Sequence, residues 1–337
     1  MKAVGYRQSL PIEHPESLLD FEAPDPVASG RDLLVEVRAI AVNPVDGKVR
    51  LRAQPPAGQT AILGWDAAGV VKAVGPDCTL FRPGDEVWYA GDVTRPGCNS
   101  ELHLVDERIV GRKPASLDFA QAAALPLTSI TAWELLFERL GIHTGKQPRG
   151  ESLLIIGAAG GVGSILTQIA SRLTALTVIG TASREETRAW VLQNGAHQVI
   201  DHSRPLSEEL RRIGVPHVTH VAALTQTDHH WEQIVESLEP QGHLCLIDDP
   251  PVIDVKLLKK KSIALHWELM FTRSMFQTPD MIAQHHLLNE VSALVDAGIL
   301  KTTFADHFGR VCAENLKKAQ ALIQSGRSRG KIVLEGF

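Results

Sequence analysis

The spacing of hydrophobic residues changes from strand-like to helical in the middle of this chain. Residues 152–157 form a short apolar run, and a cluster of glycines follows it. After the glycines, Val162, Ile165, Ile169 and Leu173 recur every three or four positions, as on one face of a helix. This pattern predicts a strand, a tight turn and a helix in direct succession.

The same alternation continues regularly for more than a hundred residues. Predicted strands lie near residues 152–157, 177–181, 197–200, 217–222, 243–247 and 262–266. Predicted helices lie near residues 161–173, 185–194, 206–213 and 230–238. Strands that alternate with helices in this way form a doubly wound parallel sheet, so an α/β fold is expected here.

The regions on both sides of this sheet have a different pattern. Residues 1–124 are rich in short strands and turns, which is typical of a small barrel. Helical spacing begins near Phe119, and Thr128 or Ser129 is expected to cap a helix over residues 131–140. The end of the chain contains two predicted helices and two predicted strands, over residues 281–297, 313–325, 303–308 and 331–334. We expect them to complete the sheet of residues 1–124.

Size and composition limit the classes of function. The 337 residues are enough for two domains, and 44% are hydrophobic, as in ordinary globular proteins. The net charge of −5 gives no basic surface for nucleic acid. No apolar run is long enough to cross a membrane, and no signal peptide is recognised. The four cysteines are isolated from one another, so a reducing cytoplasm is expected.

The glycine cluster is the first candidate binding site. It reads Ala158-x-Gly160-x-x-Gly163, close to the fingerprint of dinucleotide-binding turns, with alanine at the first glycine position. Free N–H groups at a helix start bind anions, so Gly160, Gly161, Val162 and Gly163 are expected to meet a pyrophosphate. The alternative is a strand–helix turn without a ligand.

The end of the next strand indicates which dinucleotide is bound. Sites for NAD usually carry an acidic residue there, but this chain has Ser183 and Arg184. A serine hydroxyl and a guanidinium can both donate hydrogen bonds to the 2′-phosphate of NADPH. NADPH is therefore the expected cofactor. The alternative is a solvated Arg184, or one paired with Glu185 or Glu186.

Several stretches, in this order and at this spacing, give the whole chain a family resemblance. They are Asn43–Lys48, Leu63–Gly69, Pro83–Val87, Ala123–Trp133 and Gly157–Gly163. The chain resembles the medium-chain dehydrogenase/reductases, within them the quinone oxidoreductase branch and its zinc-type alcohol dehydrogenase-like members. The resemblance implies a GroES-like, β-rich catalytic domain from residues 1–124 and 271–337, and a Rossmann domain from residues 125–270. It also implies a cleft between the domains and a homodimer formed by strand pairing.

The zinc ligands of the alcohol dehydrogenases are missing at the matching positions. Asn43 stands where the first cysteine would be, and Trp65 stands where the histidine would be. Near the third position the chain offers only hydroxyl groups, and there is no four-cysteine lobe. Amide and indole groups are poor zinc ligands, so no metal site is expected.

Four residues of the first domain are candidates for catalysis. By resemblance, Asn43 lies beside the nicotinamide ribose and bonds a substrate carbonyl; the alternative is that it orders the turn before Pro44. Asp46 is expected to orient the loop. Lys48 replaces a tyrosine of many quinone reductases and either stabilises an oxyanion or is solvated. Trp65 either forms an aromatic wall for a flat acceptor or packs in the core.

Three further residues are assigned to the cofactor by resemblance alone. Thr128 is expected near the nicotinamide phosphate, and His202 at the position of a tyrosine on the adenosine side. Lys331 is expected to approach the 2′-phosphate.

Together these features predict hydride transfer from NADPH to a small quinone or α,β-unsaturated carbonyl without zinc. Two alternatives remain open: a zinc-dependent alcohol dehydrogenase, and an NADPH-binding structural or binding protein with little turnover. Activity with a panel of acceptors, and metal analysis, separate the three.

Overall fold

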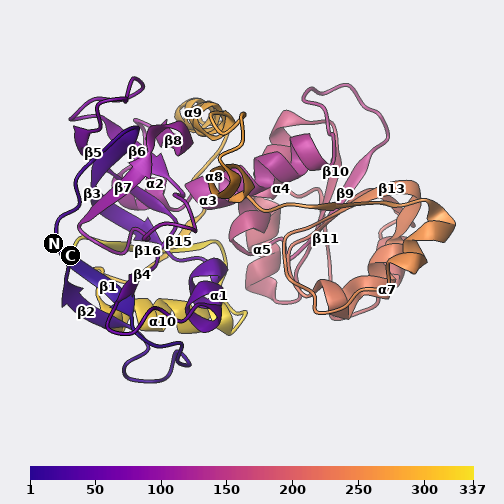
Figure 1. The fold of residues 1–337 in the computed structure, drawn as a ribbon. Helices are drawn as coiled ribbons and strands as arrows, with labels where there is room; N and C mark the ends of the chain where they lie inside the picture. Colours follow the sequence, from indigo (N-terminus) through magenta and orange to yellow (C-terminus); the bar gives the residue numbers. More distant parts are fainter. The chain divides into compact units, whose positions relative to one another are not determined.

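The computed structural model describes residues 1–337, which form two compact units (Figure 1). The first unit contains Met1–Ile130 and Phe271–Phe337, and the second contains Thr131–Met270. The sequence analysis divided the chain after residues 124 and 270. The structure has its first boundary within helix α3 (Pro126–Trp133), because this helix runs from one unit into the other.

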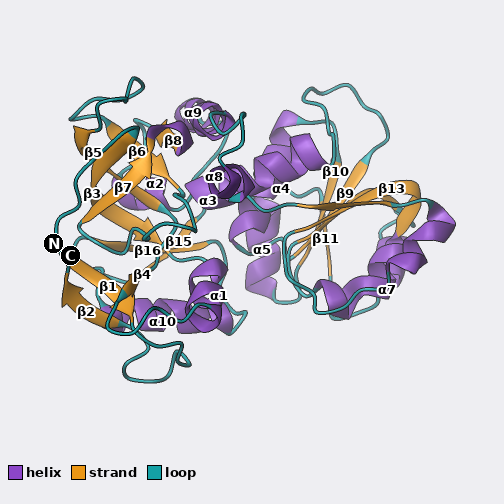
Figure 2. Ribbon diagram, viewed as in Figure 1, coloured by secondary structure: helices purple, strands orange, loops and turns teal.

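The first unit is built on a seven-stranded sheet that uses both ends of the chain (Figure 2). Its order is β15-β16-β3-β5-β6-β8, and β7 also pairs with β3. The strands are β3 (Asp32–Ala41), β5 (Ala67–Val74), β6 (Glu86–Tyr89), β7 (Leu102–Asp106), β8 (Val110–Arg112), β15 (Phe304–His307) and β16 (Lys331–Glu335). The antiparallel pair of β16 with β3 confirms that the end of the chain completes the first sheet.

A smaller sheet and several helices complete the first unit. The small sheet has the order β2-β1-β4, with β1 (Lys2–Tyr6), β2 (Leu19–Glu22) and β4 (Ala61–Ile62). The helices are α1 (Pro44–Arg52), α2 (Phe119–Ala123), α8 (Thr272–Phe276), α9 (Ala283–Asp296) and α10 (Ala313–Gln324), with a 3₁₀ turn η1 (Glu107–Ile109).

Helix α1 was missed by the sequence analysis, which treated residues 43–48 as a turn and a loop. Asn43 is its N-cap, and Pro44 occupies its first turn, where a missing N–H costs nothing. Asn43 and Asp46 form a capping box, in which each side chain serves the other's backbone N–H. The helix was hard to predict because its interior contains residues of low helix propensity, namely Gly47 and the β-branched Val45 and Val49.

The second unit contains the doubly wound parallel sheet that the sequence predicts. Its order is β11-β10-β9-β12-β13-β14, and every neighbouring pair is parallel. The strands are β9 (Ser152–Ile156), β10 (Thr177–Thr181), β11 (Gln198–Ile200), β12 (Val218–Ala223), β13 (Leu238–Leu246) and β14 (Ala264–Trp267). This confirms the predicted α/β fold class.

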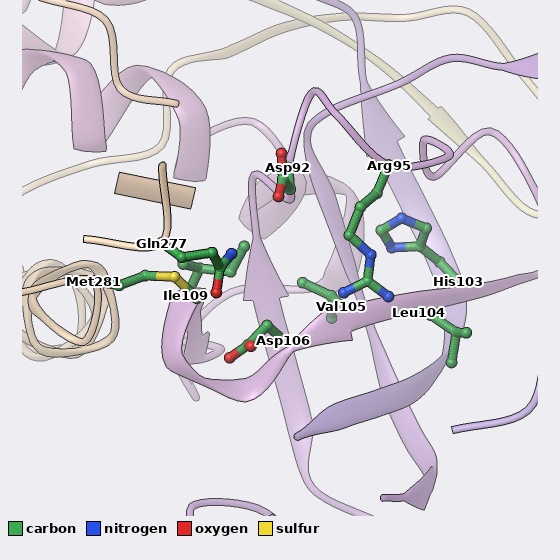
Figure 3. A pocket seen from close by; sticks show the side chains of 9 residues that line it. All are labelled: Asp92, Arg95, His103, Leu104, Val105, Asp106, Ile109, Gln277 and Met281. Carbon is green, nitrogen blue, oxygen red and sulfur yellow. The ribbon is translucent and has the colours of Figure 1, made fainter. Parts of the chain in front are cut away.

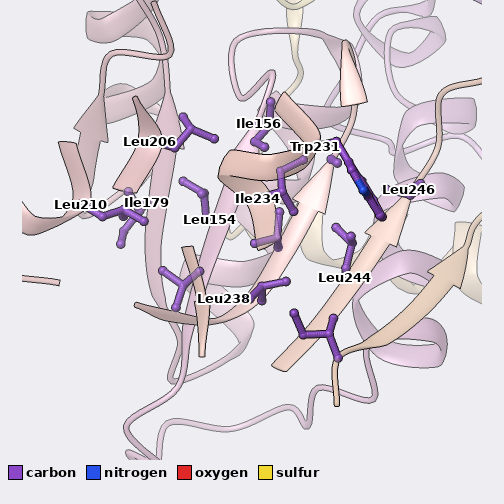
Figure 4. Packing of buried hydrophobic residues seen from close by; sticks show 14 of the residues in the cluster. Leu154, Ile156, Ile179, Leu206, Leu210, Trp231, Ile234, Leu238, Leu244 and Leu246 are labelled. Carbon is purple, nitrogen blue, oxygen red and sulfur yellow. The ribbon is translucent and has the colours of Figure 1, made fainter. Parts of the chain in front are cut away.

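Helices α6 and α7 cover one face of this sheet and bury a large apolar cluster (Figure 4). Leu206 and Leu210 of α6, and Trp231 and Ile234 of α7, pack against strand residues such as Leu154. Each fully buried side chain of this size contributes about 1.5–3 kcal/mol. The helices of the unit are α4 (Gly161–Leu173), α5 (Glu185–Gln193), α6 (Leu206–Arg212) and α7 (Thr227–Ser237), with a 3₁₀ helix η3 (Val255–Lys261).

The prediction for the helix near residue 130 was wrong in its start and in its cap. Thr128 does not cap a helix from residue 131, because α3 already begins at Pro126. The Thr128 hydroxyl donates to Leu125 O at 3.1 Å, and the helix continues as a π-helix, η2 (Glu134–Arg139). Among all the helices of the chain, none combines the length and apolar character needed to cross a membrane.

Candidate active site

The glycine turn of the second unit has the geometry of an anion-binding helix start. Gly157 follows β9 with φ of +84°, a conformation that favours glycine, and Gly160 is the N-cap of α4. A Cβ on Gly163 would lie 2.4 Å from Gly157 O, so only glycine lets the helix approach the strand this closely. The first N–H groups of α4, from Gly161 to Gly163, have no intrahelical acceptor by helix geometry and are suited to a phosphate.

The end of β10 presents polar side chains to solvent. Ser183 and Arg184 are both exposed, and Arg184 is the N-cap of α5. Thr181, the last residue of the strand, is buried and accepts a hydrogen bond from Gly157 N at 3.1 Å. No carboxylate stands at the strand end, although Glu185 and Glu186 follow in the first helical turn. Sites for the unphosphorylated dinucleotide usually carry a carboxylate at that position.

His202 follows the neighbouring strand, β11, and is partly buried. Its ring makes an edge-to-face contact with His230 of α7, at 6.3 Å between centroids. Its Nδ1 atom is buried and has no hydrogen-bond partner.

The first unit contains a buried ionic cluster of Asn43, Asp46, Asp66 and Lys331, which we call the Lys331 cluster. Each of these side chains is at most 3% exposed. Lys331 Nζ donates to Asp66 Oδ2 at 2.8 Å, to Val42 O at 3.1 Å and to Asn43 Oδ1. These three acceptors use all three donors of the ammonium group.

Asp66 and Asn43 extend the cluster to further elements. Asp66 Oδ2 also accepts from Asn43 Nδ2 at 3.0 Å, and Asp66 Oδ1 accepts from Leu127 N at 3.0 Å. Burial raises the pKa of Asp66, and the ammonium of Lys331 opposes that shift. The cluster thereby joins the end of β3 and the starts of α1, β5, α3 and β16 in one hydrogen-bond network.

Asp46 is the least satisfied member of the cluster. Its Oδ2 atom accepts from Asn43 N at 2.9 Å, but its Oδ1 atom has no partner. Burial raises the pKa of Asp46 to about 7, while the Asn43 N–H and the charge of Lys331 limit the shift. Lys331 supplies one positive charge for two carboxylates, and the charge of Asp66 also raises the pKa of Asp46.

These contacts change the roles expected for Asn43 and Lys331. Asn43 Nδ2 donates to Asp66 Oδ2 at 3.0 Å and to Ala41 O at 3.3 Å, so the donors of this amide are used inside the first unit. The alternative reading, an asparagine that orders the turn before Pro44, matches the observed cap. The ammonium of Lys331 is buried and uses its donors inside the first unit, where it balances the charge of Asp66.

The remaining first-unit candidates lie in different surroundings. Trp65 is 2% exposed, donates from Nε1 to Asp92 O at 3.1 Å and packs edge-on against Phe271, so it is a core residue. Thr128 is also buried. Lys48 lies on α1 and is partly exposed.

The donor set near Asn43 does not fit zinc. The cluster offers carboxylate and amide oxygens that already surround an ammonium, and a second cation there would be repelled. The nearby Cys98 donates to Asp66 O at 3.6 Å, and burial raises the pKa of its thiol, which disfavours the thiolate that zinc requires. His103 has both ring nitrogens engaged, with Tyr89 Oη and with Pro96 O.

The first unit also contains a small polar cavity (Figure 3). It is lined by residues that include Asp92, Arg95, His103 and Gln277. Its volume of about 10 Å³ is enough for a single water molecule, so it is no site for an organic substrate.

Sequence reasoning missed Asp66 as the counter-ion of the cluster. In the sequence it stands out only as part of the stretch Leu63–Gly69 that carries the family resemblance. A carboxylate at the start of a buried strand indicates that a cation lies nearby in the fold. The sequence does not show which cation, because Lys331 is 265 positions away.

The comparisons with known proteins agree over the length of the chain. Residues 29–115 match the family model of the alcohol dehydrogenase GroES-like domain, and residues 194–334 match that of zinc-binding dehydrogenases. A zinc-type alcohol dehydrogenase-like protein of Staphylococcus aureus strain MSSA476 is 39% identical, over 99% of both chains.

Solved structures give the same picture. A protein of Rhizobium etli CFN 42, whose name assigns it to zinc-dependent alcohol dehydrogenases, is 56% identical with a TM-score of 0.96, over 100% of this chain and 98% of the other. Escherichia coli quinone oxidoreductase in complex with NADPH is 25% identical with a TM-score of 0.84, over 99% of this chain and 100% of the other.

The Lys331 cluster predicts a large loss of stability for Lys331→Met. The substitution leaves the Asp66 carboxylate buried without its cation, and the free energy of unfolding should fall by about 3–5 kcal/mol in urea titrations. Adding Asp66→Asn removes the stranded charge and should recover part of the loss. Lys318→Met, which breaks an exposed pair with Glu314, is the control and should have little effect. A Lys331→Met protein as stable as wild type contradicts the account.

The raised pKa of Asp46 predicts that Asp46→Asn gains stability relative to wild type as the pH rises. The folded carboxyl holds its proton up to a pKa of about 7, against 3.8 as the ordinary value, so wild type loses stability as pH rises between these values. The amide does not titrate, so the variant should gain relative to wild type through that window, by up to about 4 kcal/mol, and level off above it. Melting temperatures across pH measure this, with exposed Asp77→Asn as control. If the difference in melting temperature between Asp46→Asn and wild type does not change with pH, the raised pKa of the buried Asp46 is refuted.

Proposed function

Because the chain belongs to the medium-chain dehydrogenase/reductase superfamily, we propose that it is an NADPH-dependent, zinc-independent reductase of quinones or α,β-unsaturated carbonyls. Membership makes it an oxidoreductase with quinone oxidoreductase neighbours. The observation that carries the finer proposal is the Lys331 cluster, where an ammonium and its hydrogen-bond partners occupy the region of the lost zinc ligands.

The residues of the second unit support the choice of cofactor. The N–H groups from Gly161 to Gly163 hold the pyrophosphate, and the turn at Gly157 brings them to the sheet edge. Ser183 and Arg184 donate to the 2′-phosphate, and the strand end lacks the carboxylate that would repel it. The Escherichia coli quinone oxidoreductase structure contains NADPH, which agrees with this assignment.

The donor set of the first unit supports zinc independence. Oxidation of a simple alcohol requires stabilisation of an alkoxide, which a zinc ion provides in metal-dependent dehydrogenases. Here the corresponding oxygens bind Lys331 Nζ, and their geometry suits an ammonium. A zinc-dependent alcohol dehydrogenase, the second candidate, would require displacement of Lys331 from a buried ion pair.

The acceptor follows from what the protein can stabilise. Bound NADPH supplies a hydride from its nicotinamide ring. A quinone or enone spreads the resulting charge by conjugation, so hydrogen-bond donors can replace a metal. Lys48 is the proposed donor, because it is a partly exposed cation on α1, and Asn43 and Asp46 fix the start of that helix. Asn43 thus acts by positioning α1.

Association and location complete the proposal. Strand β14 is at the edge of the parallel sheet, and its Trp267 is 52% exposed. An open edge with an exposed aromatic residue suits pairing with a second copy, so we propose a homodimer. All four cysteines are free thiols, which agrees with the reducing cytoplasm.

The cofactor assignment predicts a selective effect of Arg184→Ala. Loss of a charge-assisted hydrogen bond to the 2′-phosphate should raise the Kd of NADPH about tenfold to a hundredfold and leave that of NADH nearly unchanged. Fluorescence titration measures both constants. Arg211→Ala, which removes an exposed pair with Glu236, is the matched control and should change neither. Equal affinity of the wild-type protein for the two cofactors would refute the assignment.

The acceptor assignment predicts activity without metal. Protein dialysed against a chelator should reduce ortho- or para-quinones or conjugated enones with NADPH, and should not oxidise simple primary alcohols. Steady-state kinetics with parallel zinc analysis test both statements. Stoichiometric zinc whose removal abolishes activity would favour the zinc-dependent alternative. NADPH binding without turnover of any acceptor would favour a binding protein.

A further inference from the structure

Arg184 and His202 follow two neighbouring strands of the parallel sheet, each within three residues of the strand's last residue. Strands β10 and β11 pair in register, with Thr181 opposite Ile200, and Ala182 N donates to Ile200 O at 3.0 Å. Paired parallel strands lie about 4.8 Å apart, so Arg184 and His202 emerge at the same sheet edge. Their proximity also appears in electrostatics, because the Arg184 charge lowers the pKa of His202.

His202 has a ring that no hydrogen bond holds in one protonation state. Its Nδ1 atom has no partner, and its only recorded ring contact is the edge of His230. The charged and titratable groups around it are Asp201 beside it, Arg184 at the start of α5, and the α7 residues His230, His229 and Asp228. Burial lowers the pKa of His202, Asp201 opposes this, and Arg184 adds to it. The imidazole is therefore neutral when the site is empty at neutral pH.

We propose that His202 binds the 2′-phosphate together with Arg184 and takes up a proton when it does so, which makes the preference for NADPH over NADH stronger as pH falls. This inference rests on the proposed use of NADPH and adds a pH dependence to it. The proton comes from solvent, and no bond to carbon or phosphorus changes. The imidazole then donates a charge-assisted hydrogen bond to a phosphate oxygen.

The direction of the effect follows from linkage. A phosphate anion near His202 raises the pKa of the imidazole, so at pH values between the two pKa values binding is accompanied by proton uptake. Affinity for the phosphorylated dinucleotide rises as pH falls through this window. A dinucleotide without the 2′-phosphate lacks the anion, and its affinity should not follow the same course.

The effect can be measured with the adenosine halves of the two cofactors, which are 2′,5′-ADP for NADPH and 5′-AMP for NADH. Calorimetric titrations with 2′,5′-ADP and with 5′-AMP, at about pH 8 and about pH 6, give their affinity ratio at each pH without the acid-labile nicotinamide. In the wild-type protein the ratio should rise about tenfold towards the lower pH. Titrations in two buffers of different ionisation enthalpy should show proton uptake for 2′,5′-ADP.

Two variants assign the effect to a residue. His202→Gln should lose the rise and the proton uptake, while it retains most of its affinity for 5′-AMP. His217→Gln is the control and should behave as wild type, because this exposed histidine precedes β12 and so lies at the amino-terminal end of the parallel strands, whereas His202 follows the carboxyl end of β11. The 2′-phosphate of the ligand itself titrates near pH 6, and it does so with wild type and with both variants. The result is therefore the difference between variant and wild type in how the affinity ratio changes with pH.

The outcomes separate this inference from the proposed function. If His202→Gln keeps the wild-type pH dependence, or weakens 2′,5′-ADP and 5′-AMP equally, the inference is overturned and NADPH use still stands. If the wild-type protein shows no preference for 2′,5′-ADP at either pH, the cofactor assignment itself fails.

Discussion

The ion pair between Lys331 and Asp66 is the interaction on which the first unit depends most. The two groups lie 2.8 Å apart, 265 positions apart in sequence and almost out of contact with solvent. A buried charge without its partner destabilises a protein strongly. The pair therefore favours the arrangement in which the start of β16, with Lys331, lies close to the start of β5, which follows Asp66. The two charged groups make further hydrogen bonds, with Val42 O, Asn43 and Leu127 N. These bonds offset the free-energy cost of burying the charges.

The same ion pair is also the basis of the chemistry that we propose for the site. A lysine ammonium surrounded by oxygens lies against Asn43, the position at which the sequence resemblance would place a zinc ligand. It stabilises the fold, but its three donors are used, so it offers no hydrogen bond to a substrate. In the proposed function the acceptor's conjugation and a partly exposed donor, Lys48, therefore stabilise the charge, which is the reason for proposing quinones and enones rather than alcohols.

The sequence predicted those parts of the structure that depend on local pattern. The β–α alternation and the turn from Gly157 to Gly163 follow from residues close together in the chain, and both appear as predicted. Helix α1 was missed, although its capping pair Asn43 and Asp46 was visible, because its interior lacks apolar periodicity. The role of Lys331 could not be predicted, because its counter-ion comes from the other end of the chain.

The central claim is that this protein moves a hydride to a conjugated acceptor without a metal ion. Its most direct test is a single turnover of chelator-treated protein with NADPH that carries deuterium at the transferred position of C4, and a conjugated enone. Magnetic resonance of the product should show deuterium on the β-carbon, with oxidation of NADPH at the same rate before and after zinc is added. Transfer that appears only after zinc is restored, or deuterium found elsewhere than on the β-carbon, would contradict the account.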